Sequence, residues 1–142
     1  MGLKAFNAGC NVIAIEKNNR KYAMTCAWAS MVAYDKVGLL IGSQSETGKI
    51  LTVGDICGIS ALADDQLNIS NFIGETHSTE VDKFKDIKYT QDQSAIFIDD
   101  AKVLMKVQVA EIVHFKDIEE DNYVVFNVLS AKENQEKKFL SF

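Results

Sequence analysis

The stretch GSQSETGKILTV, residues 42–53, gathers hydroxyl, amide and ammonium groups where an apolar run passes into a helical pattern. Free backbone amides and the positive end of the dipole at a helix start stabilise a bound anion. The side chains that add hydrogen-bond donors or positive charge to this turn are Ser43, Gln44, Ser45, Thr47 and Lys49. The turn is therefore a candidate phosphate site, with the alternative that its hydroxyls serve as a helix N-cap.

The turn does not match the standard nucleotide-binding loop. Gly42 and Gly48 lack the GxxxxGK[ST] spacing, and Ile50 stands where that motif needs a hydroxyl for Mg²⁺. The pattern therefore argues against ATP chemistry. No Ser/His/Asp set, paired carboxylate site or zinc spacing can be assembled along the chain, so we predict no catalytic side chain and no metal site.

The composition bounds the class of protein. The chain has 142 residues, 47% of them hydrophobic, which suits one globular domain over residues 1–142. The formal charge of −5 argues against an extended nucleic-acid or anionic-membrane surface, because both need a clustered positive field. Any anion must therefore be bound locally. No apolar run approaches the roughly 18 residues that span a bilayer, and the N-terminal residues lack signal-peptide features, so we expect a cytoplasmic protein.

The three cysteines, Cys10, Cys26 and Cys57, form no CxxC pair and have apolar neighbours. Small buried thiols are most common in such surroundings. We therefore expect structural thiols rather than a zinc or redox pair.

Hydrophobic alternation predicts mostly strands. A first strand over 11–16 and a polar hairpin turn over 17–21 precede a long strand over 22–34 and a buried strand over 37–43. A short helix from 47, closed by Gly54 in a left-handed cap, and a strand over 57–62 follow. Residues 63–74 look like a second helix, capped by Asp64 or Asp65, with a buried stripe of Leu67, Ile69, Phe72 and Ile73.

Further strands are expected over 94–98, 102–115 and 122–131. Because the strands come in hairpin-like series, the pattern favours a mainly β fold over a doubly wound sheet. We predict a small antiparallel barrel of six to eight strands with two inserted helices.

Three segments, 24–51, 58–84 and 101–129, together resemble the flavin reductase-like family of FMN-binding split barrels, which also contains flavoredoxins. The resemblance runs from about Val12 to Ala131. Its most specific pieces are MTCAWAS followed by YD, the hydroxyl-rich turn before the first helix, and FIGETHSTEVDKF.

The resemblance implies where a flavin is held. The strand through Thr25, Cys26, Ala27, Trp28 and Ser30 is expected to lie along the isoalloxazine ring and ribityl chain. The turn with Ser43, Gln44, Ser45, Thr47 and Lys49 is expected to take the 5′-phosphate of FMN. His77 and Asn122 are candidates for the substrate side of the flavin. In a flavoprotein the cofactor carries the chemistry, so no catalytic side chain is required.

The chain also departs from the family pattern. Lys36 and Val37 stand where the family usually has a proline pair, and Asp121, Asn122 and Asn127 stand where it has Asp-His followed by Gly. An amide at 122 cannot change its protonation near neutral pH, unlike a histidine. This departure concerns the nicotinamide side of the site more than the flavin side.

The resemblance implies an FMN-binding oxidoreductase of the NAD(P)H:flavin or flavoredoxin type, with FMN rather than FAD, NAD(P)H as a possible substrate, and a homodimer. The first alternative is an electron carrier or flavin-holding module without turnover of nicotinamide, which Asn122 favours. The second is a barrel that has lost flavin and serves as an interaction domain.

Each of four further side chains allows two interpretations. Trp28 either contacts the flavin ring or anchors the core. His77 either faces the nicotinamide or is a solvated loop residue. Asp82 and Lys83 are expected to form an exposed pair that closes a loop or lies at a dimer interface.

Overall fold

The computed structural model describes residues 5, 9–42, 45–76, 78, 82–117 and 122–141. Nine strands and two helices follow one another along these residues. In chain order they are β1 (Asn11–Lys17), β2 (Arg20–Cys26), β3 (Ala29–Ala33), β4 (Lys36–Ile41), α1 (Glu46–Ile50), β5 (Ile56–Ala61), α2 (Leu67–Glu75), β6 (Tyr89–Asp92), β7 (Ala95–Ile98), β8 (Val103–His114) and β9 (Asn122–Glu133).

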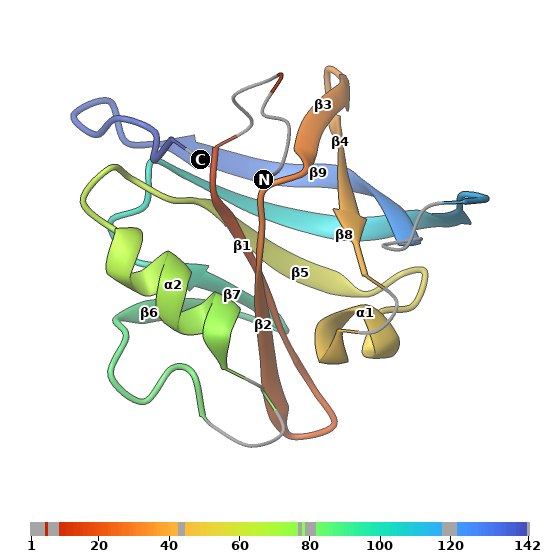
Figure 1. Ribbon diagram of the computed structural model, residues 1–142, viewed down its shortest axis with the longest axis horizontal. Coiled ribbons are helices and arrows are strands. Elements are labelled where there is room, and N and C mark those ends of the chain that lie inside the picture. The colour runs from red at the N-terminus through yellow and green to blue at the C-terminus, as the bar shows by residue number, and fades with distance from the viewer. Residues whose placement is uncertain are drawn as a thin grey trace.

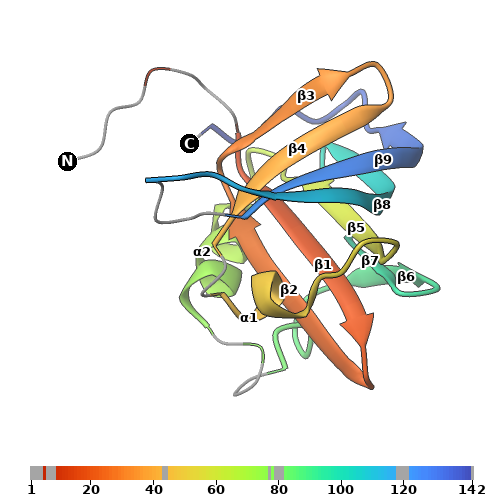
Figure 2. The ribbon, with the colours of Figure 1, turned by 90° about the vertical axis from the view of Figure 1, so that its right-hand side faces the viewer.

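All the strands belong to one antiparallel sheet with the order β3-β4-β9-β8-β5-β1-β7-β6, and β2 pairs with the other side of β1. Residues Asn11–Ala14 of β1 pair with β5, whereas Ile15 pairs with β7. The sheet therefore divides along β1. It curls strongly, but no pairing among the described residues closes it (Figure 2). The predicted fold class, a mainly β split barrel with two inserted helices, is confirmed.

The strand count exceeds the expected six to eight for two local reasons. The long strand expected over 22–34 bends at Ala27 and Trp28, which separates β2 from β3. The short strand β6 has the polar sequence YTQD and is exposed throughout, so it carries no hydrophobic alternation.

The strand β1 is covered on both faces, which explains its continuous apolar run. Ile13 and Ile15 belong to the core inside the curled sheet, together with Phe126. Val12 and Ala14 point the other way, into a second core. Because side chains alternate along a strand, β1 joins the two cores and fixes α2 against the outside of the barrel.

The helix α2 lies across the outer face of the β1–β2 hairpin (Figure 1). Ile73 is buried and Ile69 packs against the second core, as expected. Leu67 and Phe72 are exposed, so the stripe predicted for this helix was too wide. The helix begins after Gln66, not at a capping aspartate, and the Gln66 side chain instead accepts a hydrogen bond from Ala63 N at 2.9 Å.

The short helix α1 ends at Ile50, before the glycine that was expected to close it. Gly54 does have a left-handed backbone, with φ of +96°, but it lies in the turn that leads into β5. Its amide donates to Val109 O at 2.8 Å, so the glycine joins this turn to β8. Among the described residues, no helix has the length and apolarity to cross a membrane.

Candidate functional site

A cleft of about 340 Å³ lies along β2, between α1 and the segment that follows α2. We call it the polar cleft, because hydroxyl and charged side chains from three separate segments line it. They are Thr25 from β2, Ser45, Glu46, Thr47 and Lys49 from the α1 region, and Thr76, Ser78 and Lys83 from the chain after α2.

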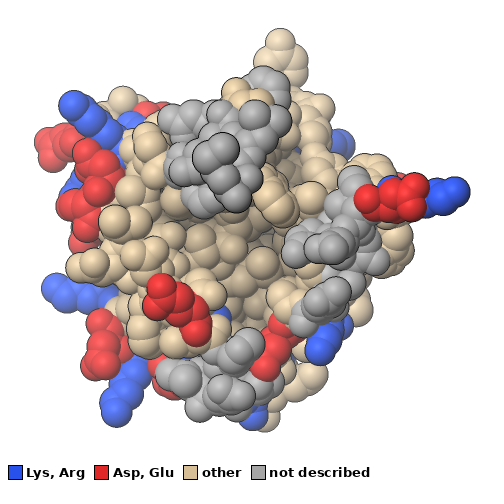
Figure 3. All heavy atoms as spheres, in the orientation of Figure 1, with Lys and Arg blue, Asp and Glu red and all other residues tan. Residues whose placement is uncertain are grey.

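A second cavity of about 250 Å³ adjoins the polar cleft and is called here the apolar pocket. Its walls come from the end of β2, the bend that follows it, and the end of β4 with Gly42. Met24 and Thr25 line both cavities, so the two lie side by side along β2. On the face shown in Figure 3, charged side chains lie mainly around the rim and uncharged ones fill the centre.

Ser45 is the N-cap of α1. Its hydroxyl accepts from Gly48 N at 2.8 Å and donates to Gly42 O at 2.8 Å. A Cβ at position 48 would collide with Gly42 O, which explains the glycine there. The Ser45 hydroxyl therefore serves as the N-cap of α1, and the same residue lines the cleft proposed from the sequence as a phosphate site. The helix has 5 residues, so its dipole is small and side chains must supply most of any anion binding.

Besides Ser45, two predicted phosphate-site residues lie together in the polar cleft. Thr47 is 2% exposed, and Lys49 is exposed on the same helix. Glu46 also lines this wall, so the cleft has a mixed charge at α1. Ser43 and Gln44, which were predicted to complete this site, lie outside the described residues.

Thr25, Cys26, Ala27 and Trp28, which are predicted to lie along the flavin, line the apolar pocket. Thr25 Oγ1 donates to Ser70 O at 2.9 Å, which ties β2 to α2. Trp28 is 60% exposed, so the alternative that it anchors the core is wrong. Ser30 is exposed on β3 opposite Gly38 and is absent from the described walls of both cavities.

Cys26 is buried, and its sulfur lies 3.4 Å from Trp28 O and 3.5 Å from Leu40 O. Burial raises the pKa of this thiol to about 11, against a weaker opposing effect of the Trp28 carbonyl contact. The side chain is therefore a neutral thiol near neutral pH and contributes shape rather than reactivity. Cys10 and Cys57 are also free and buried, as structural thiols usually are.

Lys83 is the residue that sequence reasoning missed. Instead of forming an exposed pair with Asp82, it is 4% exposed and lines the polar cleft. Its Nζ donates to Ile73 O at 2.7 Å and to Ala23 O at 2.8 Å. Asp82 is exposed and accepts from Phe84 N at 3.0 Å. The available signal was the position of Lys83 directly before Phe84, which is also buried.

The two candidates for the substrate side differ in what the structure shows. His77 lies outside the described residues. Asn122 begins β9, is 6% exposed, and its Oδ1 has no hydrogen-bond partner among the described residues. It pairs with Ile41, the residue before Gly42 of the apolar pocket. Asn122 thus lies beside the pocket without lining it.

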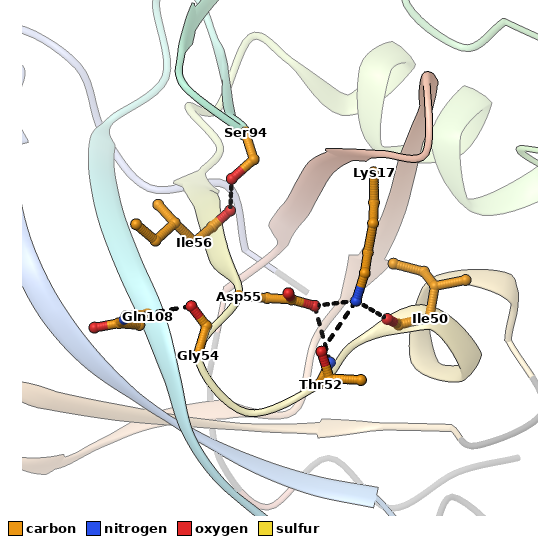
Figure 4. Close-up of polar contacts among 8 residues, drawn as sticks. All are labelled: Lys17, Ile50, Thr52, Gly54, Asp55, Ile56, Ser94 and Gln108. Atoms are coloured by element: carbon orange, nitrogen blue, oxygen red, sulfur yellow. Dashed lines mark hydrogen bonds and ion pairs between the residues drawn. The ribbon is translucent and has the colours of Figure 1, made fainter.

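A cluster of polar contacts holds the far end of α1 (Figure 4). Lys17 Nζ donates to Ile50 O at 2.7 Å and to Thr52 Oγ1 at 3.0 Å, and forms an ion pair with Asp55 at 2.7 Å. Asp55 also accepts from Thr52 N at 2.9 Å. Because the last carbonyls of a helix have no partner within it, Lys17 supplies one and fixes α1 to β1. The cluster therefore positions the helix that carries Thr47 and Lys49.

Several solved structures with a similar fold and low sequence identity have names that refer to flavins. The NADH:FAD oxidoreductase SgcE6 from Streptomyces globisporus has a TM-score of 0.85 at 16% identity, covering 96% of this chain and 81% of that one. An FMN-binding protein from Thermus thermophilus has a TM-score of 0.81 at 16% identity, with 92% and 74% covered. A flavoredoxin from Methanosarcina acetivorans has a TM-score of 0.80 at 12% identity, with 99% and 87% covered.

A search of curated protein sequences gives no significant match. A family model described as a flavin reductase like domain matches residues 3–141, nearly the whole chain. The resemblance inferred from the sequence segments is thereby confirmed, and the chain belongs to the flavin reductase-like family.

Proposed function

We propose that this protein binds FMN in the polar cleft and apolar pocket and moves electrons through it, as an NAD(P)H:flavin or flavoredoxin-type oxidoreductase. The observation that carries the proposal is that the two cavities lie side by side along β2 and share Met24 and Thr25 in their walls. A mainly apolar cavity beside a polar, lysine-bearing one suits the two ends of FMN, a ring and a phosphate.

The residues present fit such a group. Trp28, Ala27 and Cys26 offer neutral surface for a ring. Because the pKa of the Cys26 thiol is raised, no thiolate forms beside this ring near neutral pH. Thr47 and Lys49 offer a hydroxyl and a charge for the phosphate, together with Ser43 and Gln44 by the family resemblance. The names of the similar structures, which include an FMN-binding protein and an NADH:FAD oxidoreductase, support a flavin cofactor.

A bound flavin supplies the electron-transfer chemistry, and the protein supplies position, electrostatics and access. Thr25 fixes the flavin strand through its bond to α2. The Lys17 cluster fixes α1, and with it Thr47 and Lys49. The neutral walls of the apolar pocket exclude water from a bound flavin ring, which favours packing of the ring against these walls over its exposure to solvent.

The first test is the visible absorption spectrum of the freshly purified protein, with mass identification of what heat releases. Flavin bands with released FMN support the proposal, whereas released FAD would replace FMN as the cofactor. A colourless protein that also rejects added FMN at micromolar concentration would overturn the proposal and favour an interaction domain.

A second candidate function is an electron carrier without nicotinamide turnover. The buried amide of Asn122, at the position where the family pattern has a histidine, favours it, because an amide does not exchange a proton near neutral pH. Rapid mixing of the flavin-loaded protein with NADH and NADPH separates the two. Bleaching of the flavin absorbance indicates a reductase, and persistent colour indicates a carrier.

We further propose a homodimer. The edge strand β3 exposes Met31 and Val32, and Tyr34 follows it, so this edge offers apolar surface to a second copy. Light scattering on the purified protein tests the assembly, and a monomer at micromolar concentration would contradict it. The three free thiols, all buried, support a reducing compartment such as the cytoplasm.

A further inference from the structure

Met24 lies at the boundary of the two cavities. It is a half-buried residue of β2, and its side chain lines both the polar cleft and the apolar pocket. It also packs against the core inside the curled sheet. The residue therefore forms part of the wall of the site while it is still anchored in the core.

The Met24 sulfur contacts the residue that caps α1. Its Sδ lies 3.5 Å from Ser45 Oγ, and the same hydroxyl lies 2.8 Å from Gly42 O and accepts from Gly48 N. A serine hydroxyl has one proton to donate, and a thioether sulfur is a weak acceptor. The proton therefore goes to the Gly42 carbonyl, and the sulfur leaves the cap of α1 undisturbed.

Oxidation of this sulfur would change the balance between the two acceptors. Hydrogen peroxide transfers one oxygen atom to a thioether: the O–O bond breaks, an S=O bond forms, and water leaves with both protons. The sulfur thereby loses the two electrons that the peroxide gains. The product, methionine sulfoxide, is polar where methionine is apolar. Its oxygen would compete with the Gly42 carbonyl for the Ser45 proton, and it would place a polar atom in the wall shared with the apolar pocket.

We propose that Met24 is an oxidation site at which hydrogen peroxide weakens flavin binding, and that a bound flavin protects this site. The proposal rests on the proposed flavin function. Oxidation disturbs the N-cap of α1, the helix that carries Thr47 and Lys49. It also inserts an oxygen where a ring would pack. A flavin in the two cavities covers the wall that contains Met24, so peroxide reaches the sulfur less often.

Two other methionines serve as references in the same molecule. Met31 on β3 is 61% exposed and is absent from the described walls of both cavities. Met105 on β8 is half-buried, packs against the same core as Met24, and is likewise absent from these walls. Exposure by itself would make Met31 the first to react. Its position in the cavity wall predicts instead that Met24 is the methionine whose reaction depends on flavin.

The competing explanation is that Met24 only fills the core. A sulfoxide in a core disrupts packing without any ligand, so a loss of affinity would then accompany unfolding. A ligand that protects by stabilising the whole fold would also protect Met105, which packs against the same core. Direct coverage by flavin protects Met24 alone.

The test treats flavin-free wild type with hydrogen peroxide, with and without saturating FMN, and follows each methionine by peptide mass. We expect FMN to slow the oxidation of Met24 several-fold and to leave the rates of Met31 and Met105 unchanged. Fluorescence titration after treatment should show FMN binding weakened on the order of tenfold, the size expected for loss of a helix cap.

Two variants isolate the site. Met24→Leu replaces the sulfur by a side chain of similar volume, so its FMN affinity after peroxide should equal its own affinity before treatment. Met31→Leu is the matched control, and it should lose affinity on treatment as the wild type does.

The role of Met24 would be overturned by equal protection of Met24 and Met105, by unchanged FMN affinity once Met24 is oxidised, or by unfolding of the oxidised protein in circular dichroism. Failure of the untreated wild type to bind FMN would instead overturn the proposed function. If Met24→Leu does not fold, repair of the oxidised wild type decides. Methionine sulfoxide reductases for both sulfoxide epimers should restore the affinity, and an affinity that stays low after Met24 is reduced again would contradict the proposal.

Discussion

Lys36 and Asn127 face each other across β4 and β9, and Lys36 Nζ donates to Asn127 Oδ1 at 2.6 Å. These are two positions at which the chain departs from the family pattern, which has a proline and a glycine there. Neither proline nor glycine can make this side-chain contact. The two departures are therefore a single structural unit, and they lie away from the described walls of both cavities.

This pairing predicts a measurable coupling. Lys36→Met and Asn127→Ala should each lower the free energy of unfolding by about 0.5–1 kcal/mol, because the bond is partly exposed. The double variant should lose no more than the larger single loss, since either change removes the same bond. Urea unfolding measures all three. Additive losses would show that the two side chains act independently.

The phosphate assignment can be tested at α1. Thr47→Ala combined with Lys49→Ala should weaken FMN binding by on the order of 2–4 kcal/mol if both side chains make charge-assisted bonds to the phosphate. Fluorescence titration measures the affinity, and circular dichroism checks the fold. The control is Lys85→Ala, outside the cleft. Unchanged affinity in a folded double variant would rule out the phosphate site at this turn.

The barrel could be predicted because its signal is local. The alternating apolar residues of β8, with Val107 and Val109 buried, follow directly from side-chain direction in a strand. An N-cap supplied by the hydroxyls of the turn was also an expected alternative, and the structure identifies the capping residue as Ser45. These features depend on a few neighbouring residues each.

The role of Lys83 could not be predicted because its partners are distant. Ala23 is 60 residues away along the chain and Ile73 is 10. In sequence Lys83 lies beside Asp82 in a polar stretch, which is typical of an exposed pair. The exposure of Leu67 and Phe72 has a similar cause, because the narrow contact of α2 with the hairpin is set by tertiary packing.

FMN binding should depend on pH through Lys83. Its pKa is lowered to about 8 by burial, so the flavin-free protein loses this charge above pH 8. Lys83 lines the cleft in which the phosphate is proposed to bind, so binding favours its protonated form. The affinity for FMN should then fall by up to about tenfold per pH unit above 8, because the protein must take up a proton to bind. Titrations between pH 7 and pH 9 measure this. The Lys83→Arg variant should show a flat profile if it binds, since arginine stays charged.

The same lowered pKa has the opposite effect on the stability of the flavin-free protein. Between pH 8 and the ordinary lysine value near 10.4, the unfolded chain binds more protons at position 83 than the folded one does. The contribution of Lys83 to the free energy of unfolding should therefore rise with pH in this window. Urea unfolding of wild type and Lys83→Met at pH 8 and pH 10 isolates it, and a parallel change in both proteins would contradict the assignment.

Cys26 should be unreactive although it lines the apolar pocket. Burial raises the pKa of its thiol to about 11, and a thiol is a poor nucleophile. Iodoacetamide at pH 8 should label it slowly in the folded protein and rapidly in urea, as read by peptide mass. Cys26→Ala should keep flavin reduction close to the wild-type rate. Fast labelling of the native protein would show that the pocket stabilises a thiolate.

The last prediction concerns Lys17, which binds the C-terminal end of α1. All three donors of its ammonium group have acceptors, at Ile50 O, Thr52 Oγ1 and Asp55 Oδ2. Lys17→Met removes the donor of a helix-end carbonyl and the ion-pair partner of a partly buried carboxylate, so the free energy of unfolding should fall by about 1.5–3 kcal/mol. The matched control is Lys21→Met, because Lys21 pairs with Glu16 at 3.5 Å near the surface and its loss should cost about 0–1 kcal/mol.

Lys17→Met should also weaken FMN binding more than riboflavin binding, although Lys17 is absent from the described walls of the polar cleft. The reason is that α1 carries Thr47 and Lys49, and a loosened helix end no longer holds them in one arrangement against a phosphate. Fluorescence titration with both flavins measures the difference. Lower stability with unchanged FMN affinity would show that the Ser45 cap alone positions α1, and that the Lys17 cluster serves the fold without serving the site.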